Sequence, residues 1–301
     1  MTEQLPPDVI ARLAALDPEI TPQLAQASWA LLTPFHEKAG YTAPKIDRDL
    51  AYGDDPRHRL DVHTAGDDYG GRPVFVFVHG GGFVRGDKHT PGSPQYDLVG
   101  AWAVRRGYVG VTMTYRLAPD HTWPSGAEDV AKAVHWLRQN IAAYGGDPDK
   151  IVVAGNSAGA VHVASFVAGH GGGDPGSIAG AALLSGIYHI HTPAPGEPEH
   201  VYYGPDPDPA VVSSLPGLLE TTVPLLFSVA ERDPARFQQE AAHVVSAWFG
   251  RHGTVPDLVW VEGHNHMSTI ASLTVDEPAL GTPLARFIER HTPATDKETA
   301  Q

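Results

Sequence analysis

The pattern of hydrophobic and polar residues alternates between two kinds of segment from about residue 58 to residue 291. Short runs rich in β-branched and aromatic residues, such as "RPVFVFV" (72–78) and "KIVVAG" (150–155), are typical of strands. Longer segments between them space their apolar residues for one helical face, as at Val130, Val134 and Leu137. Apolar strands separated by helices predict an α/β fold, with a mostly parallel central sheet covered by helices on both faces.

The same pattern places the other elements and marks two segments that do not follow it. Further strands are expected at 58–65, 107–119, 178–187, 223–233 and 256–266, and further helices at 158–171, 234–249 and 279–291. Residues 1–45 form a helical part punctuated by prolines, and residues 187–222 form a long excursion rich in prolines and turns. Long excursions of this kind are usually functional, so we expect these two segments to form a small lid on a single domain of residues 1–301. The tail 292–301 is expected to be disordered.

Composition limits the classes of function. The chain has 301 residues, of which 42% are hydrophobic and 19% charged, enough for a sizeable core. A formal charge of −14 argues against a nucleic-acid partner, and the lack of cysteine excludes disulfides and thiolate catalysis. We find neither a secretory signal nor an apolar run of about 18 residues, so we expect a cytoplasmic protein with no membrane partner. The oligomeric state is left open, and a homodimer is compatible with the sequence.

The stretch "GNSAG" (155–159) lies between an expected strand and an expected helix. A G-x-S-x-G turn in this context is so tight that it tolerates little side chain beside the serine, and it presents Ser157 as a nucleophile at the carboxyl end of the sheet. The helix start behind it offers backbone N–H groups to a developing oxyanion. The alternative is an ordinary strand-to-helix turn that contains a serine.

A second glycine run, "HGGG" (79–82), ends the strand at 72–78. Glycines leave backbone N–H groups free to point inward, so the amides of Gly81 and Gly82, with that of Ala158, are expected to form an oxyanion hole. His79 is expected to support this loop. The alternative, a phosphate loop, is disfavoured because "GGGF" continues into neither G-K-[ST] nor G-x-G-x-x-G spacing.

An activated serine also needs a base and an acid that orients the base. The late strands supply two candidates for each, Glu231 and Asp233 as acids and His264 and His266 as bases, in the chain order Ser…Asp…His. His264 and His266 would face the same way in an extended segment. The histidine pairs "HIH" (189–191) and "HNH" (264–266) also suggest metal binding, but there is no H-E-x-x-H motif, so we expect neither a metal nor another cofactor.

Four ordered motifs, HGGG, GNSAG, "YRLAPDHTWPSGAEDV" (115–130) and "AERDP" (230–234), make the chain resemble the α/β-hydrolase superfamily over roughly residues 45–290. More narrowly, it resembles the HGGG-type esterases of the hormone-sensitive lipase and arylformamidase-like branch. The resemblance implies Asp233 as the acid and His266 as the base, with Met267 where relatives often have phenylalanine. Arg116 and Asp129 are expected to form a structural pair. A pocket for apolar acyl or aryl groups is expected from the aromatic residues Phe83, Trp123, Tyr188, Tyr202 and Trp29.

The expected function is that of a serine carboxylesterase acting on small-molecule esters with short- to medium-chain acyl or aryl groups. One alternative is an arylformamidase-like amide hydrolase that uses the same three residues. A second alternative is a binding protein that has lost catalysis, which the presence of serine, acid and histidine disfavours.

Overall fold

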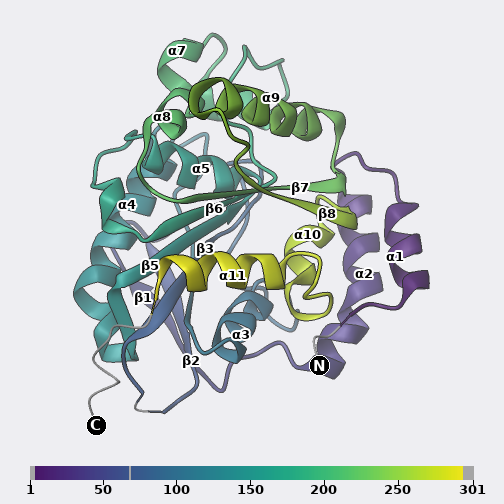
Figure 1. The fold of residues 1–301 in the computed structure, drawn as a ribbon, viewed down its shortest axis with the longest axis vertical. Helices are drawn as coiled ribbons and strands as arrows, with labels where there is room; N and C mark the ends of the chain where they lie inside the picture. The colour runs from purple at the N-terminus through teal and green to yellow at the C-terminus, as the bar shows by residue number, and fades with distance from the viewer. Residues whose placement is uncertain (1–3, 68, 294–301) are drawn as a thin grey trace.

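The computed structural model describes residues 4–67 and 69–293, so the expectation of a disordered tail falls outside the described residues from 294 onward. Its centre is an eight-stranded sheet with the order β1-β2-β4-β3-β5-β6-β7-β8 (Figure 1). The strands are β1 (Lys45–Ala51), β2 (Arg59–Thr64), β3 (Arg72–Val78), β4 (Val109–Met113), β5 (Gly146–Asn156), β6 (Gly180–Leu184), β7 (Leu225–Arg232) and β8 (Asp257–Asn265).

The six strands from β3 to β8 pair in parallel, whereas β2 pairs antiparallel with both β1 and β4. This confirms the expected α/β fold with a mostly parallel sheet. β1 was not expected, because its sequence "KIDRDLA" is mostly charged and its side chains are partly or fully exposed. It is a strand at the edge of the sheet, and its pairing with β2 defines it.

Helices cover both faces of the sheet, and β3 shows how the sequence divides them. Val74, Val76 and Val78 point into one hydrophobic core and Phe75 and Phe77 into the other, as the two-residue period of a strand requires. The first core packs against α4 (Ser125–Asn140), α5 (Ala158–Val167), α8 (Leu215–Glu220) and α9 (Ala235–His252). The second packs against α3 (Asp97–Arg105), α10 (Ser268–Ala271) and α11 (Gly281–His291).

The two segments outside the alternation lie near the carboxyl ends of the strands. α1 (Pro7–Ala14) and α2 (Pro22–Ala39) pack beside β8 and α10 (Figure 1). The excursion holds only short helices, α6 (Pro198–Tyr203), α7 (Pro209–Val212) and α8, and each has a proline in its first turn. Within the described residues, no helix is both long enough and apolar enough to cross a bilayer.

Candidate active site

Ser157 occupies the sharp turn between β5 and α5, with φ 57° and ψ −124°. This is a strained conformation for a residue with a side chain, and such strain is typical of functional sites. The flanking glycines are required by close backbone approach. A Cβ on Gly155 would collide with the backbone of Gly159, and a Cβ on Gly159 would collide with the carbonyl of Val78. The first glycine is therefore required by the close approach of the turn to itself, and the second by packing against the end of β3.

The glycine loop after β3 lies directly against this turn. A Cβ on Gly80 would stand 3.3 Å from the Cβ of Ser157, and a Cβ on Gly81 would collide with the carbonyl of Arg85. Gly81 and Gly82 both have positive φ, 132° and 59°. Among the described residues, none accepts a hydrogen bond from the N–H of Gly81, Gly82 or Ala158. Three backbone donors are therefore available beside Ser157, as an oxyanion hole requires.

His79 contacts the glycine loop through its ring and its backbone carbonyl. Its ring Nδ1 lies 2.6 Å from the carbonyl oxygen of Gly80, and the hydroxyl of Tyr115 donates to the carbonyl of His79 at 2.9 Å. Burial lowers the pKa of His79 to about 4, so the imidazole is neutral near pH 7. A neutral ring that donates from Nδ1 to Gly80 braces the loop.

Asp233 and His266 form a buried pair at the ends of β7 and β8. Nδ1 of His266 lies 2.6 Å from Oδ1 of Asp233. The second oxygen of Asp233 accepts hydrogen bonds from the hydroxyl of Ser185 and the N–H of Ala230, both at 2.7 Å. These donors stabilise the charged carboxylate and fix its orientation. Sequence reasoning missed the role of Ser185, whose only signal was its position at the end of β6.

The three residues expected to act together follow the carboxyl ends of β5, β7 and β8, and hydrogen bonds link these ends. Ser157 donates its N–H to the carbonyl of Leu184 at 2.9 Å, and the next residue, Ser185, contacts Asp233. Nε2 of His266 is buried and makes no hydrogen bond within the described residues, the Ser157 hydroxyl included. Catalytic hydrogen bonds are often long before substrate binds, so this nitrogen remains available as a base.

The rival acid and base have other partners. His264 lies with Nδ1 3.0 Å from the hydroxyl of Ser268 and with Nε2 3.1 Å from Asp276, so both ring nitrogens are used. Glu231 accepts the N–H of Gly263 at 2.7 Å. His264 and His266 thus have separate partners, because this end of β8 is irregular: Gly263 has φ 72° and the register with β7 shifts. The assignment of Asp233 and His266 stays a prediction, and their mutual geometry favours it.

The structure groups three of the five aromatic residues expected in the pocket. Phe83 stacks on Tyr202 with 4.5 Å between ring centroids, and both share a cluster with Ala158 that Trp123 borders. The other two lie in different clusters. Tyr188 is in the main core, where its hydroxyl donates to Leu183, and Trp29 packs near His36. Tyr188 was expected as an aromatic residue of the excursion and Trp29 as one of the N-terminal helical part, and residue type alone does not distinguish core from pocket.

The expected pair of Arg116 and Asp129 is confirmed. The Arg116 side chain donates from Nε at 2.9 Å and its backbone N–H at 2.8 Å to the two oxygens of Asp129. Burial opposes the charged form of Arg116, yet the hydrogen bonds with Asp129 and Glu128 raise its pKa overall. His58 also contacts Asp129, at 2.9 Å. This network fixes the loop after β4 to α4.

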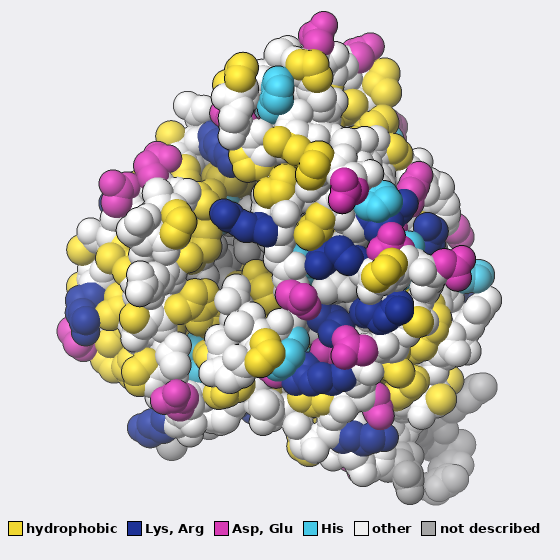
Figure 2. Space-filling view, turned by 180° about the vertical axis from the view of Figure 1, so that it is seen from behind, with side chains coloured by type: hydrophobic (Ala, Val, Ile, Leu, Met, Phe, Trp, Pro, Cys, Tyr) yellow, Lys and Arg dark blue, Asp and Glu magenta, His cyan; other side chains and the backbone are white. Residues whose placement is uncertain are grey.

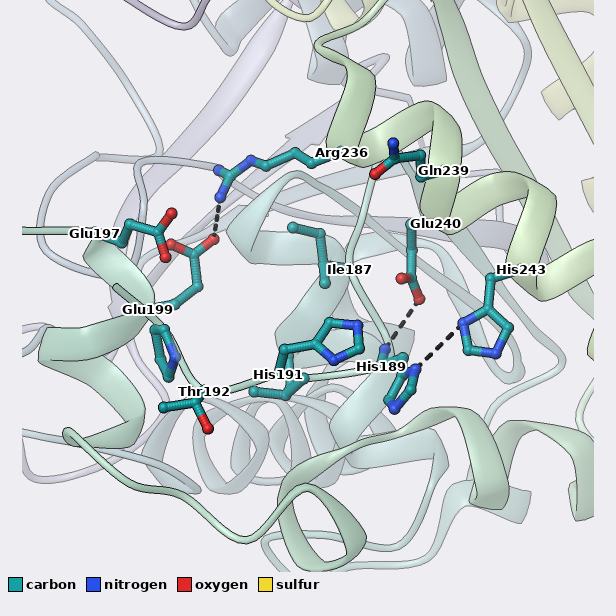
Figure 3. Close-up of a pocket in the computed structure, with 12 residues that line it drawn as sticks. Ile187, His189, His191, Thr192, Glu197, Glu199, Arg236, Gln239, Glu240 and His243 are labelled. Atoms are coloured by element: carbon teal, nitrogen blue, oxygen red, sulfur yellow. Dashed lines mark hydrogen bonds and ion pairs between the residues drawn. The ribbon is translucent and has the colours of Figure 1, made fainter. Parts of the chain in front are cut away.

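A cavity of about 400 Å³ lies between the excursion and α9 (Figure 3). Arg236 and Glu199 form an ion pair of 2.9 Å at its side. The Arg236 guanidinium also lies over the ring of Phe237, which in turn contacts His266 with 4.4 Å between ring centroids. Ile187 lines the cavity and also packs against the Phe83 cluster. Two side chains, Arg236 and Phe237, thus stand between the cavity and the predicted base His266. Figure 2 shows that the face seen from behind is hollowed near its middle, with hydrophobic side chains around the hollow.

Parts of the chain are similar in sequence to known proteins. The family model described as BD-FAE matches residues 60–174. Esterase LipC of Mycobacterium tuberculosis is 38% identical over 150 residues, covering 47% of this chain and 36% of that protein. Isoprenylcysteine alpha-carbonyl methylesterase of Arabidopsis thaliana is 35% identical over 150 residues, covering 48% and 34%. The matches thus span little more than a third of the length of these relatives.

A solved structure of an esterase from Pyrobaculum calidifontis superposes with a TM-score of 0.69 at 22% identity, covering 96% of this chain and 100% of that chain. This likeness concerns the fold. The residues that the family model matches, 60–174, include the glycine loop and the serine turn. The chain therefore has the fold of this esterase, an α/β-hydrolase fold, and part of it is similar in sequence to the BD-FAE family model and to curated esterases.

Proposed function

We propose that the chain is a serine carboxylesterase that hydrolyses small-molecule esters with short- to medium-chain acyl or aryl groups. The observation that carries the proposal is the buried pair of His266 and Asp233, with Nδ1 2.6 Å from Oδ1. The pair lies at the carboxyl ends of the strands, as the strained Ser157 does. The esterases among the relatives support ester hydrolysis as the reaction.

In this proposal each residue has one task. Asp233 accepts the Nδ1 proton of His266 and fixes its tautomer. Nε2 of His266 takes the proton of Ser157 as the serine oxygen attacks the ester carbonyl. The N–H groups of Gly81, Gly82 and Ala158 stabilise the oxyanion, with each donor contributing about 3 kcal/mol in the transition state. His266 then protonates the leaving alcohol, and water releases the acid by the reverse steps.

The size of the site supports the proposed substrate range. Phe83, Tyr202 and Trp123 give an apolar wall beside Ala158, and Pro198 of the excursion lies against Gly82, where a Cβ would stand 3.1 Å from the Pro198 Cβ. This packing narrows the site beside Gly82, and on this basis we expect long acyl chains to find little room. The cytoplasmic location expected from the sequence is part of the same proposal.

Replacement of Ser157 by alanine tests the proposal most simply. Ser157→Ala should retain the fold, by circular dichroism and thermal unfolding, and lose nearly all hydrolysis of p-nitrophenyl butyrate. The matched control is Ser177→Ala, which removes a serine hydroxyl bonded only to the Asp174 carbonyl in a surface turn. Retention of more than a few per cent of activity by a folded Ser157→Ala protein would refute the nucleophile.

A further inference from the structure

The pair His189 and His191 plays no part in the proposed hydrolysis, yet the fold brings it to a third histidine. His189 and His191 lie in the excursion after β6, and His243 lies on α9 (Figure 3). Nδ1 of His189 is 3.3 Å from Nδ1 of His243. The ring of His191 is 4.4 Å from that of His189, centroid to centroid. Three imidazoles from two separate segments thus lie in a row at the side of the cavity, with His189 between His191 and His243 (Figure 3).

The spacing of the first two nitrogens is that of two ligands on one metal ion. Ligand nitrogens at 2.0–2.1 Å from a tetrahedral zinc ion are about 3.3 Å apart. His189 and His243 form a hydrogen bond across this distance. A small rotation of the two rings would let both nitrogens face one ion, and rotation of the exposed His191 side chain about its torsions would bring in a third nitrogen.

The surroundings favour a cation. Glu197, Glu199 and Glu240 line the same cavity, and the Arg236 charge there is already paired with Glu199. Glu240 also accepts the backbone N–H groups of Tyr188 and His189, both at 2.9 Å. It therefore holds the backbone of His189 in place.

We propose that His189, His191 and His243 bind one transition-metal ion of the Zn²⁺ or Ni²⁺ type, with a fourth position open to the cavity. Neutral imidazoles suit these ions, and three protein ligands with one open position are a common zinc arrangement. The bound ion ties the start of the excursion to α9. Because Ile187 packs against the Phe83 cluster, this tie also steadies the wall of the proposed substrate site. The inference depends on the three histidines alone and not on the esterase activity.

Calorimetric titration of EDTA-treated protein with Zn²⁺ and with Ni²⁺ tests the site. The wild type should bind one ion per chain with micromolar affinity, and saturating metal should raise Tm by a few degrees. His243→Ala and His191→Ala, which change exposed side chains, should each weaken binding at least tenfold and remove the rise in Tm. The matched control is His135→Ala, an exposed helical histidine on α4 bonded to Gln139, which should bind as the wild type does.

The results of these titrations distinguish a specific site from nonspecific metal binding at the surface, and they test the metal site independently of the proposed esterase activity. The site would be overturned if His135→Ala weakened metal binding as much as His243→Ala does. It would also be overturned if the wild type bound the metal with a Kd above about 1 mM. Titration of the Ser157→Ala protein should give the wild-type affinity, since Ser157 is no ligand. Failure of metal binding would leave ester hydrolysis intact, and loss of hydrolysis would leave metal binding intact.

Discussion

Ser185 provides the sharpest test of how the site is built, because it touches the predicted acid and not the substrate. Its hydroxyl donates to Oδ2 of Asp233 at 2.7 Å, and both side chains are about 2% exposed. A hydrogen bond to a charged group contributes about 1.5–3 kcal/mol, which corresponds to a factor of about 10 to 150 in rate. Ser185→Ala should therefore lower kcat within this range and leave KM nearly unchanged.

The backbone at Ser185 makes a second variant useful. Ser185 has φ 49°, a conformation that glycine adopts at no steric cost and alanine does not. Ser185→Gly and Ser185→Ala both remove the hydroxyl, so both should lose activity to a similar extent, measured with p-nitrophenyl butyrate under saturating conditions. Asp233 keeps the Ala230 N–H in both variants. Since both variants lack the hydroxyl, a kcat within twofold of the wild type in either one would refute Ser185 as a positioning residue.

Three further predictions concern the turn, the pH dependence of stability and the substrate range. Gly159→Ala should lower the free energy of unfolding by at least about 3 kcal/mol in urea titrations, because its Cβ would collide with the carbonyl of Val78; unchanged stability would contradict the packing. The free energy of unfolding should fall as pH drops from 6.5 toward 4, because unfolding frees four buried histidines to bind protons: His36, His63, His79 and His162. Burial lowers the pKa of the first three to about 4 and that of His162 to about 3, which costs about 3 kcal/mol each by pH 4. Urea midpoints that stay constant between pH 7 and 5 would argue against this account. Hydrolysis of p-nitrophenyl esters should decline beyond about eight acyl carbons, and rates that rise up to palmitate would exclude the closed pocket.

The fold was predictable because its signals are local. Each strand from β3 to β8 carries an apolar run and β2 alternates apolar and polar residues, while Gly81, Gly155 and Gly159 are required by backbone contacts. β1 gave no such signal, since a charged strand at a sheet edge is recognised only by its partner. α3 also escaped notice, because "DLVGAWAVR" is buried on nearly every side and lacks an amphipathic pattern.

The candidate site was predictable only where chain order and motif position sufficed. The choice of Asp233 over Glu231, and of His266 over His264, came from resemblance; the structure adds that each rival is bonded elsewhere. Contacts between distant segments produce no local pattern in the sequence. Ser185 could not be connected with Asp233, nor the "HIH" pair with His243, because these contacts arise from tertiary packing.

The central claim is that Ser157, His266 and Asp233 act as one unit. Mass spectrometry of the adduct formed with a fluorophosphonate probe tests this claim directly, because the probe reacts only with an activated serine. The wild type should take up one label per chain on Ser157, and His266→Gln should react at least a hundredfold more slowly while remaining folded. A label on another residue, or equal labelling rates in the two proteins, would contradict the account.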